Sequence, residues 1–313
     1  EYPYNVTRLD AYPFTDESKY GSNEKWFNNV KSLNIENMCS LKKLFSQANF
    51  DNLVDLSLSM NMGDDFKVDD FELLPPGLEK LECRICTFMY HDDFCQIRFP
   101  VGLTELSLFI ICFTNGDHEP EFIAPVFDLS YLENLKKLKY ALPTENIKFP
   151  KNLLELESSC SVPLRQLYIC CPDLVKLKCC HFSQITGDFP KKVTNLTTIV
   201  SGLTDLFEYW QNATRKTDDS KRRKLDDSSH FLSKILSQLH HFKVSYLDRD
   251  PVKFTIFPKE SAAYDFSNMK TFEMHFEDGS IIGDIPSSLT SLRVTRTKDL
   301  DFSRFKYFGN LVD

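Results

Sequence analysis

A short apolar phrase that recurs along the chain is the feature that most constrains its fold. The phrase is Leu-x-x-Leu-x-Leu, and it often follows a Phe-Pro or Pro-Pro step. It stands out at residues 78–83, 103–108, 153–158, 193–196 and 289–294. The last two apolar residues of the phrase stand two apart, which is the period of a β-strand, so both side chains point to one face. Each phrase therefore predicts one short strand with a buried face.

The spacing of the phrases predicts how the strands are arranged. We call the first apolar residue of each phrase its anchor. The anchors are Val6, Val30, Leu53, Leu78, Leu103, Leu135, Leu153, Leu174, Val193, Leu239, Met269 and Leu289. The intervals between the first five are 24, 23, 25 and 25 residues, which is the range of leucine-rich repeats. A strand at each such interval, with the chain returning in between, predicts a stack of parallel strands.

Burial energetics favour the same architecture. Burying one Leu-sized side chain stabilises by about 1.5–3 kcal/mol, so several per repeat must stack on neighbouring repeats to offset chain entropy. We therefore predict an α/β repeat solenoid, like that of leucine-rich repeats, with a curved parallel sheet. Its convex connections should be short and irregular, and strands and loops should outnumber helices. The helices we expect lie at residues 23–30, 41–47 and 231–239.

The domain organisation follows from the repeat. Residues 1–313 are predicted to form one irregular solenoid, truncated at both ends. Glu1 is not an initiating Met, and residues 310–313 repeat the Asn-Leu-Val-Asp of residues 52–55, so we expect the array to continue beyond Asp313. Residues 211–230 do not fit the repeat, because they are densely charged and poor in apolar residues. We predict that they form a disordered loop inserted in the solenoid.

A basic run within that loop is a candidate signal for nuclear import. It consists of Lys221, Arg222, Arg223 and Lys224. An extended basic segment of this kind can bind the acidic grooves of import receptors. The alternative is a loop that only increases solubility, because four aspartates within it balance the basic charge.

The ten cysteines are better explained by packing than by metal binding. Cys83 and Cys179 occupy positions of the phrase where other repeats have Leu, Ile or Val, and a free cysteine packs as a small apolar residue. Two zinc sites can be drawn, one from Cys83, Cys86, His91 and Cys95, the other from residues 170–181. Strand alternation separates the cysteines in both sets. We therefore predict no metal, no cofactor and a reducing compartment, the cytoplasm or the nucleus.

Composition and motifs argue against several functions. Lys and Arg number 37 against 45 Asp and Glu, a net charge of −8, which argues against nucleic acid as a partner. No run of about 18 apolar residues occurs, so no transmembrane helix is predicted. Nucleophile-elbow, phosphate-loop and zinc-protease motifs are absent from the sequence, and we predict no catalytic residue and no enzymatic activity.

The residues between the buried positions of each strand should form a binding face on the concave side. They are Lys80, Glu82, Arg84, Glu105, Phe109, Lys137, Lys139, Glu155, Glu157, Tyr168, Lys176 and Lys178. Opposite charges on adjacent strands can pair and stabilise by about 0.2–1 kcal/mol each, so a structural role is an alternative. Phe109 and Tyr168 among charges are typical of anchors in protein interfaces, which favours a protein partner. The convex loops are the alternative binding surface.

The phrase, the Phe-Pro or Ile-Pro entry and the irregular period resemble the divergent leucine-rich repeats of fungal and protist proteins, including those joined to an F-box. The resemblance covers nearly the whole chain outside the charged loop. It implies an intracellular, non-enzymatic scaffold that recognises proteins as the substrate receptor of a cullin-based ubiquitin ligase. Ligase subunits would then bind a segment before Glu1. A structural or regulatory solenoid, in signalling or on chromosomes, is the alternative without a ligase.

Overall fold

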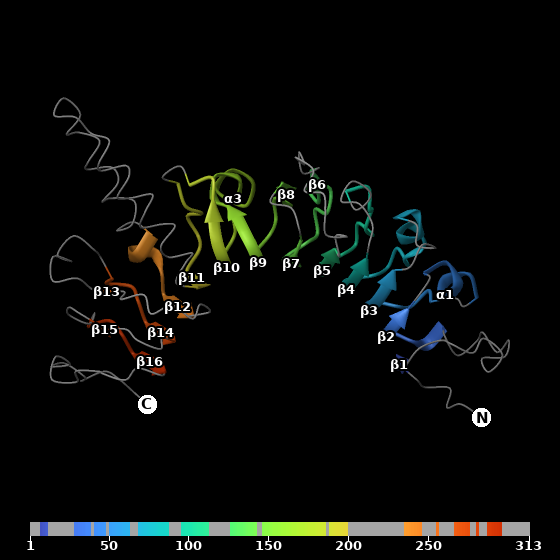
Figure 1. Ribbon diagram of the computed structural model, residues 1–313, viewed down its shortest axis with the longest axis horizontal. Coiled ribbons are helices and arrows are strands. Elements are labelled where there is room, and N and C mark those ends of the chain that lie inside the picture. The colour runs from blue at the N-terminus through green and yellow to red at the C-terminus, as the bar shows by residue number, and fades with distance from the viewer. Residues whose placement is uncertain are drawn as a thin grey trace, which may run out of the picture. The chain divides into compact units, whose positions relative to one another are not determined.

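The structure is a computed structural model. It describes residues 7–11, 28–38, 41–47, 50–62, 68–87, 95–112, 126–142, 146–185, 188–199, 235–245, 255–256, 266–275, 280–281 and 287–295. The chain divides into two compact units, Glu1–Leu153 and Leu154–Asp313. Each unit is described by itself (Figure 1).

Parallel strands in chain order form the sheet of the first unit. The six described strands of this sheet are β1 (Arg8–Ala11), β2 (Ser32–Met38), β3 (Asp55–Met62), β4 (Lys80–Thr87), β5 (Glu105–Cys112) and β7 (Lys137–Ala141). The return segments contain helix α1 (Leu41–Gln47), the 3₁₀ helix η3 (Val68–Leu73) and a small parallel pair, β6 (Phe127–Asp128) with β8 (Ile147–Lys148). Each pair of neighbouring main strands is parallel.

The second unit is built in the same way. Its described main strands are β9 (Glu155–Pro163), β10 (Lys176–Ser183), β11 (Asn195–Ile199), β12 (His241–Ser245), β14 (Thr271–His275) and β16 (Ser291–Thr295). They also pair in parallel and in chain order. Helix α3 (Leu164–Cys170) follows β9, and β13 (Thr255–Ile256) pairs with β15 (Ser280–Ile281).

These elements confirm the prediction of a long, strand-rich parallel sheet with few helices. Every main strand begins two residues after a predicted anchor. The helix expected at 41–47 is present. Residues 235–238 of the segment expected at 231–239 are helical, and the segment expected at 23–30 is described only from residue 28. Helix α3 was not predicted.

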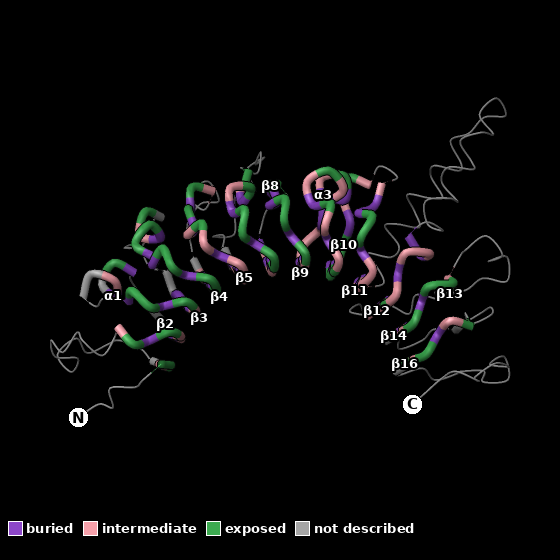
Figure 2. Tube along the Cα trace, turned by 180° about the vertical axis from the view of Figure 1, so that it is seen from behind, coloured by how far each residue is buried: buried purple, intermediate pink, exposed green. Residues whose placement is uncertain are grey.

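The core consists of the repeated apolar positions. The described anchors are all at most 3% exposed. The third and fifth residues after an anchor are buried as well in most repeats, as Leu106 and Leu108 are in β5. Buried residues therefore alternate with half-buried or exposed residues along the strands (Figure 2). This confirms the inward face that the phrase predicts.

Two polar residues occupy the fifth position, Ser158 in β9 and Thr198 in β11, and both are at most 2% exposed. A buried hydroxyl needs a hydrogen-bond partner. The Ser158 hydroxyl accepts a hydrogen bond from the Cys160 N–H (3.0 Å) and donates one to the Cys160 carbonyl (3.1 Å). The local backbone therefore satisfies this buried polar group.

The Phe-Pro step contributes to the core and closes a turn. Phe99, Phe149 and Phe189 are at most 5% exposed, so the Phe of each step is a core residue. In the first unit the ring of Phe99 contacts Phe71 of η3 edge to face, at 5.7 Å between centroids. The carbonyl of Pro100 accepts the N–H of anchor Leu103 (3.2 Å). The turn therefore uses the proline carbonyl as an acceptor, and proline has no N–H that would need a partner.

A backbone carbonyl one residue after most anchors fixes the register of the next strand. The Val54 carbonyl accepts the N–H groups of Glu79 and Lys80, both at 2.9 Å, and the Glu79 carbonyl accepts those of Thr104 and Glu105. The same pattern recurs at Thr7, Lys31, Thr104, Leu154, Val175, Thr194, His240 and Lys270. Because these repeats make the contact at the same position, each of the strands that follow starts level with the preceding one.

Asparagine side chains just before several anchors add a second contact between repeats. Asn134 donates from Nδ2 to the Val101 carbonyl (3.1 Å), and Asn152 donates to the Glu133 carbonyl (2.8 Å). Asn52 and Asn268 make the equivalent bond. Gly102 holds this position in its repeat, and a Cβ there would lie 3.2 Å from the Pro76 carbonyl oxygen. At this position several repeats therefore use an amide donor, and the repeat with Gly102 has a close backbone approach instead.

The cysteines follow strand alternation as predicted. Cys83 and Cys179 are at most 2% exposed, whereas Cys86 and Cys180 are half-buried. Burial raises the pKa of the Cys83 thiol, and it raises the pKa of Cys171 to about 12. Within the described ranges, no three His, Cys, Asp or Glu residues are placed to hold a metal ion, and His91 lies outside those ranges. Among the helices described, none is long and apolar enough to cross a membrane.

Replacing the anchor Leu103 with Ala tests the role of the buried anchors. Leu103 has no exposed surface, so we expect Leu103→Ala to lower the free energy of unfolding by about 2–5 kcal/mol in denaturant titrations. Val101 in the same turn is 64% exposed, so Val101→Ala should change the free energy by less than about 0.5 kcal/mol. Equal effects of the two substitutions would contradict the role of the anchor.

Candidate functional site

The solvent-facing residues of the strands form rows across each unit. They are the second and fourth residues after each anchor and, in the longer strands, also the sixth, and the parallel register places them opposite one another. Lys80 lies opposite Glu105, and Glu105 lies opposite Lys137. In the second unit Glu155 lies opposite Lys176. Neighbouring strands are about 4.8 Å apart, so side chains within a row are in reach of each other. We call this surface the strand face.

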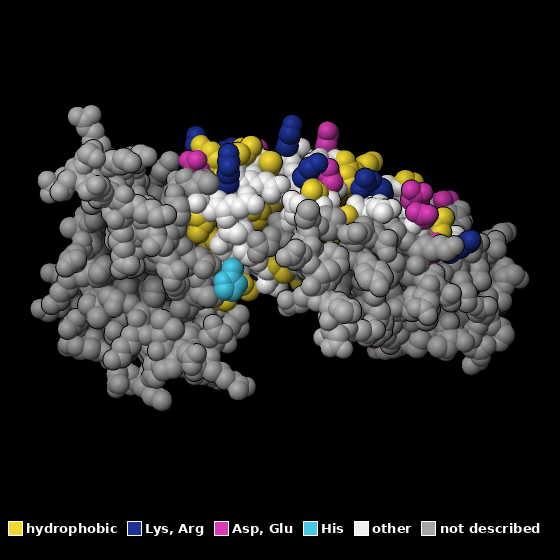
Figure 3. Space-filling model, turned by 45° about the horizontal axis from the view of Figure 1, so that its top comes forward, with side chains coloured by type: hydrophobic (Ala, Val, Ile, Leu, Met, Phe, Trp, Pro, Cys, Tyr) yellow, Lys and Arg dark blue, Asp and Glu magenta, His cyan; other side chains and the backbone are white. Residues whose placement is uncertain are grey.

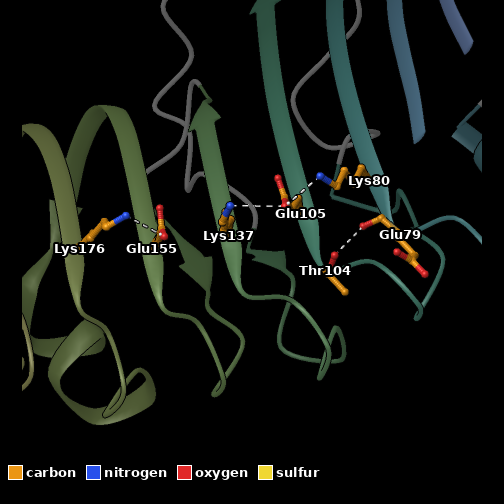
Figure 4. A network of polar contacts seen from close by, with 7 residues as sticks. All are labelled: Glu79, Lys80, Thr104, Glu105, Lys137, Glu155 and Lys176. Atoms are coloured by element: carbon orange, nitrogen blue, oxygen red, sulfur yellow. Dashed lines mark hydrogen bonds and ion pairs between the residues drawn. The ribbon is translucent and has the colours of Figure 1, made fainter. Parts of the chain in front are cut away.

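In the first unit, the carboxylate of Glu105 connects two lysines (Figure 4). Its Oε1 lies 3.2 Å from Lys80 Nζ and 3.4 Å from Lys137 Nζ, across three adjacent strands. Partial burial opposes ionisation of Glu105, but the hydrogen bonds and positive charges of the two lysines outweigh it. The pKa of Glu105 is therefore below its usual value.

In the second unit, the predicted charges also pair between strands. Lys176 Nζ lies 3.0 Å from Glu155 Oε1, and Lys178 Nζ lies 2.7 Å from Glu157 Oε1. These are residues for which the sequence allows either binding or lateral pairing. The structure brings them together as lateral pairs. Because the lysine side chains are more than half exposed, each pair contributes at most about 1 kcal/mol.

Phe109 is the aromatic residue of the strand face in the first unit. It is half-buried on β5, with Arg84 of β4 and Lys139 of β7 beside its ring. The Arg84 Cζ lies 5.9 Å from the ring centroid, and the Lys139 Nζ lies 5.4 Å from it. Arg84 also donates from Nε to Glu82 Oε1 at 2.9 Å. The predicted residues of β4, β5 and β7 therefore form one contiguous group.

The predicted placement of Tyr168 on a strand is wrong. Tyr168 lies in helix α3, because the chain leaves β9 at Pro163 and Leu164 and Leu167 become buried at helical spacing. Its ring is half-buried, and the Lys191 Nζ lies 5.9 Å from the ring centroid. Tyr168 is thus part of a return segment and does not belong to the strand face.

The strand face continues beyond the residues predicted from the sequence. Glu273 Oε2 lies 2.7 Å from Lys243 Nζ, and its Oε1 lies 3.4 Å from Arg293 Nη1. His241 Nδ1 and Thr271 Oγ1 are 2.5 Å apart. Burial, followed by the charges of His240 and Lys270, lowers the pKa of His241. The anchors at Leu239, Met269 and Leu289 predict these positions, so the phrase itself was the available signal.

Figure 3 brings forward the top of the view in Figure 1, where Lys and Arg side chains are interspersed with Asp, Glu and apolar side chains. The charge of the strand face is likewise mixed, because its lysines pair with glutamates of neighbouring strands. Such a surface offers donors, acceptors and an aromatic ring at fixed spacings, which suits non-covalent binding. The basic run at residues 221–224 and the loop at 211–230 lie outside the described residues.

The Glu105 network generates a pH prediction. A carboxyl group whose pKa is lowered by folding stabilises the protein above its unfolded pKa, near 4.5, and this contribution is lost as the pH falls through the folded pKa. Glu105→Gln should therefore lose less stability than the wild type on acidification. Because the Glu105 side chain is 36% exposed, we expect a difference of about 0.2–1 kcal/mol in denaturant titrations at pH 6 and pH 3.

Glu79→Gln is the matched control for that titration. Glu79 is exposed one repeat earlier, and its backbone carbonyl, rather than its side chain, accepts a hydrogen bond from Thr104 (Figure 4). It makes no ion pair with the described residues. An acid response of Glu79→Gln equal to that of Glu105→Gln would show that the network has no special role.

Comparison with known proteins adds no family to this geometry. No protein-family model matches the chain, and no curated protein matches its sequence. The functional interpretation therefore depends on the strand face itself.

Proposed function

We propose that the chain is a non-enzymatic protein-recognition module, built as a leucine-rich-repeat-like solenoid whose strand face is the concave binding surface. The observation that carries the proposal is the common register of the strands. It places one row of outward side chains after another at a constant spacing, while the inward residues of the strands pack into the core. The outward residues can therefore differ from strand to strand without disturbing the fold.

The chemistry of the rows supports a protein partner. The strand face combines charges of both signs with the half-buried ring of Phe109, and interfaces between proteins are similarly mixed and contain aromatic anchors. Exposed ion pairs stabilise by about 0.2–1 kcal/mol, so a partner can replace them with its own contacts at little cost.

Within this function we propose the role of substrate receptor for a cullin-based ubiquitin ligase. Its support is the resemblance of the repeat phrase to leucine-rich repeats joined to an F-box. The strand face would hold the substrate, and ligase subunits would bind the complete protein through a segment before Glu1. The location of such a receptor would be the cytoplasm or the nucleus.

A structural or regulatory solenoid without a ligase is the second candidate. The lateral ion pairs favour it, since Glu105, Glu155 and Glu157 already bind lysines of neighbouring strands. In that case the charges would align the repeats, and the partner would bind the return segments.

Site-specific photocrosslinking separates binding at the strand face from binding at the turns. A benzophenone amino acid replaces either Ser107, on the strand face of β5, or Val101, in the preceding turn. After irradiation in cells of the source organism, we expect Ser107 to give discrete crosslinked proteins that are absent for Val101. Crosslinks only from Val101 would move binding to the turns, and crosslinks from neither position would contradict recognition at this part of the surface.

Purification of the complete protein tests the ligase role separately. A receptor should co-purify with a cullin and its adaptor, and deletion of the segment before Glu1 should remove both while the strand-face crosslinks persist. If no ligase subunit co-purifies but the strand-face crosslinks are retained, the chain is a recognition module without a ligase link.

A further inference from the structure

The strand face of β4, β5 and β7 is cationic within an acidic chain. The solvent-facing residues there include Lys80, Arg84, Lys137 and Lys139 but only two carboxylates, Glu82 and Glu105. The whole chain has a net charge of −8. The solvent-facing residues of β2 and β3 include Glu36 and Asp55 and no cation. Positive charge is therefore concentrated on these three strands.

Both carboxylates of this group already bind cations of the group. Glu105 pairs with Lys80 and Lys137, and Glu82 pairs with Arg84 through a single oxygen. Arg84 uses Nε and Nη2 for that contact. Its Nη1 faces no carboxylate of the described residues, and a planar guanidinium can bind a further carboxylate through such a nitrogen.

The ring of Phe109 lies between the two outer cations. β5 is flanked by β4 and β7, so Arg84 and Lys139 approach the ring from opposite sides, at 5.9 and 5.4 Å from its centroid. The cations screen the two faces of the ring, and its outer edge remains the apolar contact in the middle of the group. Two positive charges with an apolar edge between them match a ligand that has negative charges on both sides of an apolar side chain.

We infer that Arg84, Phe109 and Lys139 form a clamp for an extended acidic peptide segment of a protein partner. An apolar side chain of the peptide packs on the edge of Phe109, and carboxylates on either side bind Arg84 and Lys139. The inference rests on the proposed function and names the partner chemistry of its strand face.

A nucleic acid is a weaker match for the same residues. Single-stranded nucleic acids bind through bases stacked on aromatic faces. The faces of Phe109 are approached by Arg84 and Lys139, so a base would have to displace a cation before stacking. Glu82 and Glu105 would also repel the phosphates. A peptide that uses the ring edge requires neither change.

Selection from a random peptide library tests the clamp directly. Phage-displayed random peptides of about twelve residues, long enough to cross three strands, are selected on the full chain. We expect the enriched peptides to place Asp or Glu on both sides of an apolar residue. Synthetic copies should lose about tenfold or more in affinity for Phe109→Ala and for the double variant Arg84→Glu, Lys139→Glu.

The charge-reversed variant should also gain binding to peptides of opposite charge, a result that a misfolded protein would not give. Copies of the selected peptides in which Lys replaces each acidic residue should bind the Arg84→Glu, Lys139→Glu variant and not the wild type. Arg98→Glu is the matched control, because Arg98 Cζ lies 5.6 Å from the Tyr131 ring centroid in a return segment. It removes the same kind of cation–aromatic contact away from the strand face and should leave peptide affinity unchanged.

Several results would overturn the clamp. They are enriched peptides without an acidic pattern, acidic peptides whose affinity is unaffected by the clamp variants, and no enrichment at all. If a thymidine oligonucleotide binds the wild type more tightly than the selected peptides do, and charge reversal abolishes that binding, the ligand of the clamp is a nucleic acid and not a peptide. Each can occur while Ser107 still crosslinks a protein, so failure of the clamp and failure of the proposed function are distinguishable.

Discussion

The stacking of buried anchor residues is the constraint on which the rest of this structure depends. A single repeat cannot bury its own apolar face, because the other wall of its core belongs to the neighbouring repeat. The described anchors are at most 3% exposed, and the strand that follows each one starts at the same position. In most repeats a backbone carbonyl accepts two N–H groups from the next repeat, and this contact aligns the starts of the two strands. Burial therefore provides the stability, and the backbone contact converts it into a common register.

The common register separates two tasks along each strand. Inward residues such as Leu106 and Leu108 make the core, and outward residues such as Glu105 and Ser107 contact solvent. Outward charges pair between strands, but exposed pairs stabilise by about 0.2–1 kcal/mol, far less than an anchor. The strand face is therefore the part of the molecule that can change most easily, and it is where we place recognition. The cationic group around Phe109 is its most distinctive chemical feature.

The strands are well predicted from the sequence because their signal is local. The anchor, the third residue and the fifth residue are read directly from the phrase, and they also identify Cys83 and Cys179 as core residues. Helix α3 and the position of Tyr168 were missed, since a helix of seven residues is decided by packing of Leu164 and Leu167 rather than by a long periodic pattern. The asparagine contacts between repeats were also missed, although Asn directly before an anchor recurs at residues 5, 29, 52, 134, 152 and 268. Contacts between side chains on different strands, such as Arg84 with Phe109, require the register and cannot be read from one repeat.

The most direct test of the account is to place aspartate at each position of each described strand, one position at a time. The folded fraction of each variant is then measured. We predict a periodic result. Aspartate at an anchor, or at the third or fifth residue after it, should unfold the chain, because a buried unpaired carboxylate costs several kcal/mol. Aspartate at the second or fourth residue should leave the chain folded. The claim is that the inward residues determine the fold and leave the strand face free for recognition. Equal tolerance of aspartate at inward and outward positions would contradict it, and so would unfolding by aspartate at outward positions.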